Sequence, residues 1–198
     1  AQSFGTEYRG HKTGTLTNVT CTSFFPAKPL GCDGDGGALF TDNEEIAKIA
    51  RSSRIHGQGV HKYQCERLGM TARLDTIQAA ILLAKLEIFD DEIKSRNQIA
   101  KMYNKHLSEV LITPYVRPNN ISAWAQYSVL AKNEREREII QAYLKDNGVP
   151  TAIYYPTPLH MQTAYKYLNQ KAGTLPISED VSKRIFSLPM HPYLDEKD

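Results

Sequence analysis

The stretch TSFFPAKPLGCDGDGGA, residues 22–38, decides how this chain is interpreted. A single lysine, Lys28, lies between Pro26 and Pro29, just after two phenylalanines and just before a run of glycines. Prolines fix backbone dihedral angles, and adjacent aromatic rings can shield an amine from water. A desolvated lysine has a lowered pKa and becomes a usable nucleophile and base, so the pattern suits Schiff-base chemistry. The same residues also fit a plain irregular loop on which Lys28 is solvated.

The segments on either side of this stretch predict strands. Residues 19–25, VTCTSFF, are rich in Val, Thr and Phe, and their alternation places Ser23 on one face only. Residues 38–41, ALFT, predict a second short strand after the glycines.

Two helices are expected next. Asp42 or Asn43 can cap a helix from about residue 44 to 54. Asp75 is expected to cap a longer helix, which can continue with a bend to residue 107. An apolar stripe at intervals of three and four is predicted to form the buried face of this helix: Leu74, Ile77, Ile81, Ala84 and Ile88.

Helices and strands also alternate in the rest of the chain. Pro, Asn and Ser cluster in residues 113–122, which predicts a linker. Residues 124–131 predict a strand, residues 134–148 a helix closed by Gly148, and residues 150–155 another strand. The order of elements predicts an α/β protein.

Composition excludes several classes of protein. The 198 residues are 41% hydrophobic, with 24 basic and 22 acidic residues interspersed along the chain. No basic face is evident, so neither a nucleic-acid nor a membrane-surface role is expected. The apolar window of residues 77–89 contains polar residues and falls short of the ~20 residues that a bilayer span needs.

The three cysteines point to a reducing compartment. Cys21, Cys32 and Cys65 are odd in number and lack the close paired spacing of a zinc site or a disulfide framework. We therefore expect a cytoplasmic protein without a metal site.

Five segments together carry a family resemblance. They are AQSFG at 1–5, SFFPAKPLG at 23–31, GDGGA at 34–38, RLDTIQAAIL at 73–82 and SLPMHPYL at 187–194. Their combination and order resemble the pyridoxal-phosphate-dependent nucleotide-sugar aminotransferases of the DegT/DnrJ/EryC1/StrS family. The resemblance covers essentially the whole chain, and its specificity lies in the combination.

The resemblance implies a fold and a domain organisation. The fold is that of fold type I pyridoxal-phosphate transferases, which are similar to aspartate aminotransferase. Residues 1–112 would form the C-terminal part of the large cofactor domain, including the long helix, and residues 113–198 a small C-terminal α+β domain. The family's aspartate that pairs with the pyridine nitrogen would lie three residues before Gln2, so we expect a longer polypeptide whose N-terminal half is not in this chain.

The resemblance also implies the cofactor-binding residues. Lys28 matches the lysine that binds pyridoxal phosphate covalently and moves a proton during the reaction. Ser23 matches a hydroxyl that binds the cofactor phosphate; a core strand serine that bonds its own backbone is the alternative. Gln2 matches an amide near the phenolic oxygen of the ring; a polar residue at a strand end is the alternative.

Two positions depart from the family pattern. Thr71 stands where the family usually has an asparagine that reaches the cofactor phosphate in the neighbouring subunit, and its hydroxyl has a shorter reach. Tyr154 and Tyr155 stand where close relatives often have His-Tyr near the sugar, and strand packing is their alternative role.

Substrate binding is assigned by the same resemblance. Residues 119–129 and 187–194 are similar to the branch that aminates UDP-linked 2-acetamido-3-keto-hexuronic acids for surface polysaccharides such as O-antigen, with glutamate as donor. Arg73 or His56 could bind the carboxylate or the diphosphate, while His56 also fits an ordinary helix end before Gly57.

The implied reaction is a ping-pong transamination in a homodimer whose sites are shared between subunits. Three alternatives stay open: amination of a 4-keto nucleotide sugar, amination of a 3-keto deoxy sugar, and a binding or regulatory module that has lost catalysis. The dehydrating relatives carry histidine in place of the lysine, so Lys28 argues against them.

Overall fold

In a computed structural model, which describes residues 1–195, the chain forms two compact units. The first comprises residues 1–97 and 116–125, and the second comprises residues 98–115 and those from 126 onward. These units differ from the predicted division after residue 112, because residues 98–112 pack with the second unit and residues 116–125 return to the first. That the units correspond to a cofactor domain and a small domain stays a prediction.

The strands of the first unit form two small sheets. The strands β1 (Glu7–Tyr8), β2 (His11–Lys12) and β5 (Asn120–Ile121) are antiparallel in the order β2-β1-β5. β5 lies within the predicted linker. The two strands predicted around the glycine run are confirmed as β3 (Thr20–Ser23) and β4 (Gly37–Phe40), which pair antiparallel with Ser23 opposite Gly37.

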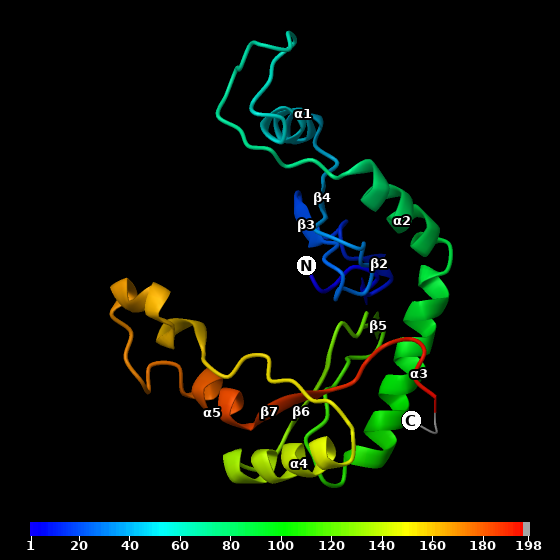
Figure 1. The fold of residues 1–198 in the computed structure, drawn as a ribbon, viewed down its shortest axis with the longest axis vertical. Coiled ribbons are helices and arrows are strands. Elements are labelled where there is room, and N and C mark those ends of the chain that lie inside the picture. Colours follow the sequence, from blue (N-terminus) through cyan, green and yellow to red (C-terminus); the bar gives the residue numbers. More distant parts are fainter. Residues whose placement is uncertain (196–198) are drawn as a thin grey trace. The chain divides into compact units, whose positions relative to one another are not determined.

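The first helix begins where the sequence predicts. α1 (Glu44–Ser53) follows β4 (Figure 1). Of the two cap candidates, Asn43 is the one that caps it, because its Oδ1 accepts a hydrogen bond from the N–H of Ile46 at 3.0 Å. The cap satisfies one of the amides that the first helical turn leaves unpaired.

The predicted long helix is bent. It consists of α2 (Thr76–Leu86) and α3 (Phe89–Leu107) (Figure 1). Asp75 takes the cap position of α2, but its side chain makes no capping hydrogen bond.

The predicted buried stripe of α2 is only partly confirmed. Leu74 packs against the core and Ile81 is half-buried, but other members of the stripe face outward. Ile77 is 74% exposed and Ile88 is 49% exposed, whereas Leu82 is only 5% exposed. Since α2 is apolar on most of its surface, its spacing alone cannot select the face that is buried.

The core of the first unit brings distant segments together. Phe4 packs against the rings of Phe24, Phe40 and Phe89, with ring centroids 5.5 to 6.1 Å apart. The buried members of this cluster come from the lysine loop, the two helices and the segment after β5: Phe24, Leu30, Cys32, Leu82, Phe89, Ile93 and Ala123. The segment that carries Lys28 is therefore built into the core on both sides of the lysine.

The second unit is built on a two-stranded sheet and helices. β6 (Tyr127–Leu130) pairs antiparallel with β7 (Ile185–Leu188). The predicted helix is confirmed as α4 (Glu134–Asp146), and Gly148 follows it at φ 78°. The 3-10 helices η1 (Leu159–Met161) and η2 (Thr163–Leu168) and the helix α5 (Pro176–Arg184) also belong to this unit, as does α3 from residue 98 onward.

Tyr127 anchors the core of the second unit. Its ring is fully buried and lies 4.8 Å from that of Tyr103, and its hydroxyl donates to Asn104. Burial, with a smaller contribution from Tyr103, raises the pKa of Tyr127 to about 12, so the phenol stays neutral and remains a donor.

Two strands predicted for residues 124–131 and 150–155 differ from the structure. Residues 124–126 precede β6 as a loop, and Trp124 has φ 46°. Residues 150–155 form no strand: only Ala152 makes a bridge, to Ser187 of β7. Pro150 cannot donate a ladder hydrogen bond, which prevents the pairing from extending on the N-terminal side of Ala152.

Within residues 1–195, no helix combines the length and the hydropathy that a membrane crossing requires.

Candidate functional site

Lys28 lies on a closed loop, residues 24–32, which we call the Lys28 loop. The N–H of Cys32 donates to the carbonyl of Phe24 at 2.8 Å, and the Cys32 thiol donates to the same oxygen at 2.9 Å. Phe24 and Leu30 are 7% and 2% exposed, so each side of the loop is anchored in the core. The ends of the loop are thereby held together.

Gly31 allows the loop to fold back on itself. A Cβ at this position would lie 2.6 Å from the carbonyl oxygen of Pro26 and 2.9 Å from that of Phe25. No side chain fits between two backbone oxygens at these distances, so this residue must be glycine. Gly36 is constrained similarly, because its Cβ would meet the Cys32 sulfur at 2.9 Å. Close packing thus explains two of the glycines that follow the lysine.

The side chain of Lys28 is half-buried. Its backbone N–H donates to the carbonyl of Phe25 at 2.8 Å, which fixes the turn. Within residues 1–195, its ammonium group forms neither a hydrogen bond nor an ion pair. The two preceding aromatic residues have different roles: Phe24 belongs to the core, whereas Phe25 is 50% exposed.

Two hydroxyl groups lie at the end of β3, just before the loop. Ser23 Oγ accepts a hydrogen bond from the N–H of Phe25 at 3.2 Å, so it bonds local backbone as the alternative reading proposed. It keeps its own proton to donate. The neighbouring Thr22 Oγ1 is buried and has no hydrogen-bond partner in the described part of the chain.

His56 and Thr71, which the sequence assigns to different roles, are joined in the structure. Their side chains meet at 3.1 Å between Nε2 and Oγ1. Both belong to the segment between α1 and α2, which is drawn in cyan to green in Figure 1. In this segment the N–H of His56 donates to the carbonyl of Met70 at 3.1 Å. His56 has φ 58° and precedes Gly57, whose Cβ would lie 1.8 Å from the carbonyl oxygen of Arg67.

The remaining predicted site residues are at the surface. Gln2 and Arg73 are exposed, and within residues 1–195 their side chains form no hydrogen bond or ion pair. Tyr154 and Tyr155 are 41% and 67% exposed and face each other edge to face, with ring centroids 5.7 Å apart. These tyrosines belong to the second unit, and their approach to Lys28 stays a prediction.

Sequence reasoning missed two residues that touch the Lys28 loop and its continuation. Gln78 Oε1 accepts a hydrogen bond from the N–H of Asp33 at 2.8 Å, and Lys85 Nζ donates to the carbonyl of Gly31 at 2.8 Å. Both residues lie on α2. Their spacing in the sequence could have identified them, because two polar residues seven positions apart in an apolar helix lie on one face.

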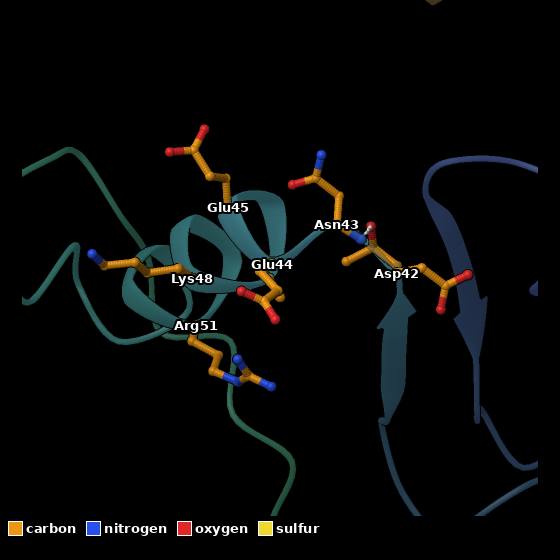
Figure 2. A pocket seen from close by; sticks show the side chains of 8 residues that line it. Asp42, Asn43, Glu44, Glu45, Lys48 and Arg51 are labelled. Carbon is orange, nitrogen blue, oxygen red and sulfur yellow. Dashed lines mark hydrogen bonds between the residues drawn. The ribbon is translucent and has the colours of Figure 1, made fainter.

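A separate open depression lies at the start of α1 (Figure 2). None of the predicted site residues lines it. Its lining residues are Thr41, Asp42, Asn43, Glu44, Glu45, Ala47, Lys48 and Arg51.

The residues around the Lys28 loop fit a small molecule that carries an aldehyde and a phosphate. The amine of Lys28, which has no hydrogen-bond or ion-pair partner among residues 1–195, can condense with an aldehyde. The Ser23 hydroxyl can donate to a phosphate oxygen. The closed backbone and the close contacts of Gly31 hold the amine on a defined support.

Comparison with known proteins finds similarity over the whole chain. The model of the DegT/DnrJ/EryC1/StrS aminotransferase family matches residues 1–198. The UDP-2-acetamido-2-deoxy-3-oxo-D-glucuronate aminotransferase of Pseudomonas aeruginosa is 51% identical over 196 residues, which are 98% of this chain and 53% of that protein. The pleiotropic regulatory protein of Geobacillus stearothermophilus is 38% identical over 201 residues, covering 100% of this chain and 53% of that protein.

The fold is shared with a solved structure. The crystal structure of a DegT DnrJ EryC1 StrS aminotransferase from Brucella abortus superposes with a TM-score of 0.95 at 49% identity, covering 100% of this chain and 52% of that chain. The chain thus spans about half the length of the relatives that it matches.

Proposed function

The chain belongs to the DegT/DnrJ/EryC1/StrS aminotransferase family, and we propose that the protein containing it is a pyridoxal-phosphate-dependent aminotransferase. It transfers an amino group from glutamate to a UDP-linked 2-acetamido-3-keto-hexuronic acid. The observation that carries the proposal is the closed Lys28 loop, on which a half-buried amine has no partner within residues 1–195. The identity of 51% to a 3-oxo-glucuronate aminotransferase supports the class of sugar.

Lys28 is the catalytic residue in this proposal. Pyridoxal phosphate, when bound, supplies an electron-withdrawing ring that makes a carbon-bound proton of the substrate removable. The Lys28 amine binds the cofactor between turnovers and, once displaced by the incoming amine, accepts and returns that proton. Its half-buried position and its fixed backbone limit the positions that its nitrogen can reach.

The other predicted residues bind and orient. The hydroxyls of Ser23 and Thr71 donate to phosphate oxygens, and the amide of Gln2 donates to the phenolic oxygen of the ring. Arg73 binds the sugar carboxylate or the diphosphate through a two-pronged contact. His56 bonds Thr71 at 3.1 Å and so orients its hydroxyl, in addition to any contact of its own with the substrate.

The roles of Tyr154 and Tyr155 are proposed to be substrate contacts. Both rings are exposed, and each carries a hydroxyl that can bond a sugar. We further propose a cytoplasmic homodimer in which Thr71 and Arg73 of each subunit serve the site of the other, with the sugar product used for surface polysaccharide.

Spectra and turnover of the full-length protein test this function. Incubation with pyridoxal phosphate should give visible absorbance that glutamate bleaches. Lys28→Ala should lose that absorbance, and its turnover should fall by ~10²- to 10⁴-fold or more. Lys94→Ala, which removes an exposed lysine paired with Asp91 at 2.7 Å, is the matched control and should behave like the wild type. Retained absorbance and turnover in Lys28→Ala would refute the assignment of the lysine.

The same assay separates the sugar substrates. A UDP-linked 3-keto-hexuronic acid should be preferred over a neutral 3-keto deoxy sugar and over a 4-keto sugar. Arg73→Gln should weaken binding of the anionic sugar and leave the glutamate half-reaction largely unchanged.

A regulatory module without catalysis is the second candidate. The 38% identity to a pleiotropic regulatory protein favours it. In that case glutamate would leave the spectrum of the full-length protein unchanged.

A further inference from the structure

We infer that Gln78 and Lys85 form a clamp on α2 that positions the Lys28 loop for catalysis. This inference rests on the proposed role of Lys28. Neither residue is expected to touch cofactor or substrate, so both are positioning residues.

The clamp residues lie on one face of α2. Gln78, Leu82 and Lys85 are separated by four and three residues, so they lie in line on α2. Leu82 is 5% exposed and belongs to the same core cluster as Phe24, Leu30 and Cys32. The buried leucine thus fixes the helix against the loop, with one polar side chain on each side of it.

The two polar side chains bind the backbone that follows Lys28. Lys85 Nζ donates to the carbonyl of Gly31 at 2.8 Å, and Gln78 Oε1 accepts from the N–H of Asp33 at 2.8 Å. Lys85 also lies 3.5 Å from the Asp33 carboxylate, but that pair is largely exposed, so the carbonyl contact matters more. Two backbone groups that follow the lysine, the carbonyl of Gly31 and the N–H of Asp33, are therefore tied to α2.

Gly31 connects these contacts to the lysine. Gly31 approaches Phe25 and Pro26 so closely that even a Cβ would lie 2.6 Å from the Pro26 oxygen. Phe25 in turn accepts the hydrogen bond from the Lys28 N–H. A displacement of Gly31 must therefore shift the turn that carries Lys28, whose amine has to reach a defined carbon during proton transfer.

Hydrogen exchange of the cofactor-free, full-length protein tests the clamp directly. Gln78→Leu removes the acceptor of the Asp33 amide, and we expect that amide to exchange at least ~10-fold faster. Amides of β6 and β7 serve as the control. They belong to the second unit and should exchange at the wild-type rate. Unchanged exchange at Asp33 would show that the clamp does not hold the loop.

Kinetics of the loaded enzyme test the catalytic consequence. Lys85→Met keeps the aliphatic stem and removes the donor, and we expect kcat to fall ~10-fold with little change in the KM for glutamate. Lys85→Arg restores a donor and should recover most of the loss. Lys94→Met is the matched control, since Lys94 pairs with Asp91 on α3 and should leave kcat unchanged.

The outcomes distinguish this inference from the proposed function. If Lys28 of the wild type takes up no pyridoxal phosphate, the proposed function fails, and exchange at Asp33 still decides whether the clamp holds the loop. If the wild type is active and kcat of Lys85→Met stays within twofold of it, the clamp is not a positioning device.

Discussion

At the scale of single residues, the lysine is supported by contacts that leave no room for larger neighbours. Gly31 is the clearest case, because the oxygens of Phe25 and Pro26 occupy the space that a side chain would need. The conformation of the loop therefore depends on the absence of a Cβ at residue 31 as well as on its two prolines.

Gly31→Ala should destabilise the protein by about 1–3 kcal/mol, since the new methyl group meets backbone that cannot move aside. Urea denaturation would measure the loss. Gly34→Ala is a graded comparison, because its Cβ would meet only the end of the Gln78 side chain at 3.2 Å. Equal effects of the two substitutions would contradict the close-packing explanation.

Glu179 is a second residue that several hydrogen bonds hold in place. It accepts hydrogen bonds from the N–H groups of Gly173 and Leu175 and from His160 at 3.0 Å. The hydrogen bond from the Gly173 amide has the largest effect on the pKa of Glu179, and that from His160 has a smaller one. Together they lower this pKa below its ordinary value of 4.5. Its stabilising effect is therefore fully present above that pH and is lost as the pH falls through the lowered value.

Consequently, Glu179→Gln should be less stable than the wild type at pH 6, and the difference should shrink toward pH 3. Thermal unfolding at a series of pH values measures this. Glu138→Gln, at an exposed position of α4, should not reproduce the pH dependence. A difference between Glu179→Gln and wild type that grows on acidification would overturn the explanation.

At the scale of elements, the N-terminal caps of α1 and α2 can be compared directly. Asn43 bonds the Ile46 amide at 3.0 Å, whereas Asp75 holds the equivalent position of α2 without a side-chain bond. Asn43→Ala should therefore cost about 1 kcal/mol of unfolding free energy, and Asp75→Ala much less. Chemical denaturation of both variants would decide, and a larger loss for Asp75→Ala would contradict the assigned caps.

At the scale of the whole molecule, the proposed sharing of sites between subunits can be tested by complementation. If Arg73 of one subunit serves the site of the other, a mixed dimer of Lys28→Ala and Arg73→Ala subunits contains one complete site. Random mixing should then restore about a quarter of wild-type activity from two variants of low activity. Absence of recovery in dimers shown to be mixed would place Arg73 in its own subunit's site or outside any site.

The sequence by itself determined the family resemblance, the lysine between two prolines, the strands β3 and β4, and the helices α1 and α4. Each of these depends on local chemistry: β-branched residues, capping side chains, and glycine or proline at turns.

Only the tertiary structure decided which face of α2 is buried, that residues 150–155 pair at a single position, and that Gln78 and Lys85 hold the lysine's loop. The sequence could not decide these points because they depend on contacts between residues about 50 positions apart for the loop and 35 for Ala152 and Ser187. α2 is apolar on most sides, so its partner, rather than its periodicity, selects the buried face.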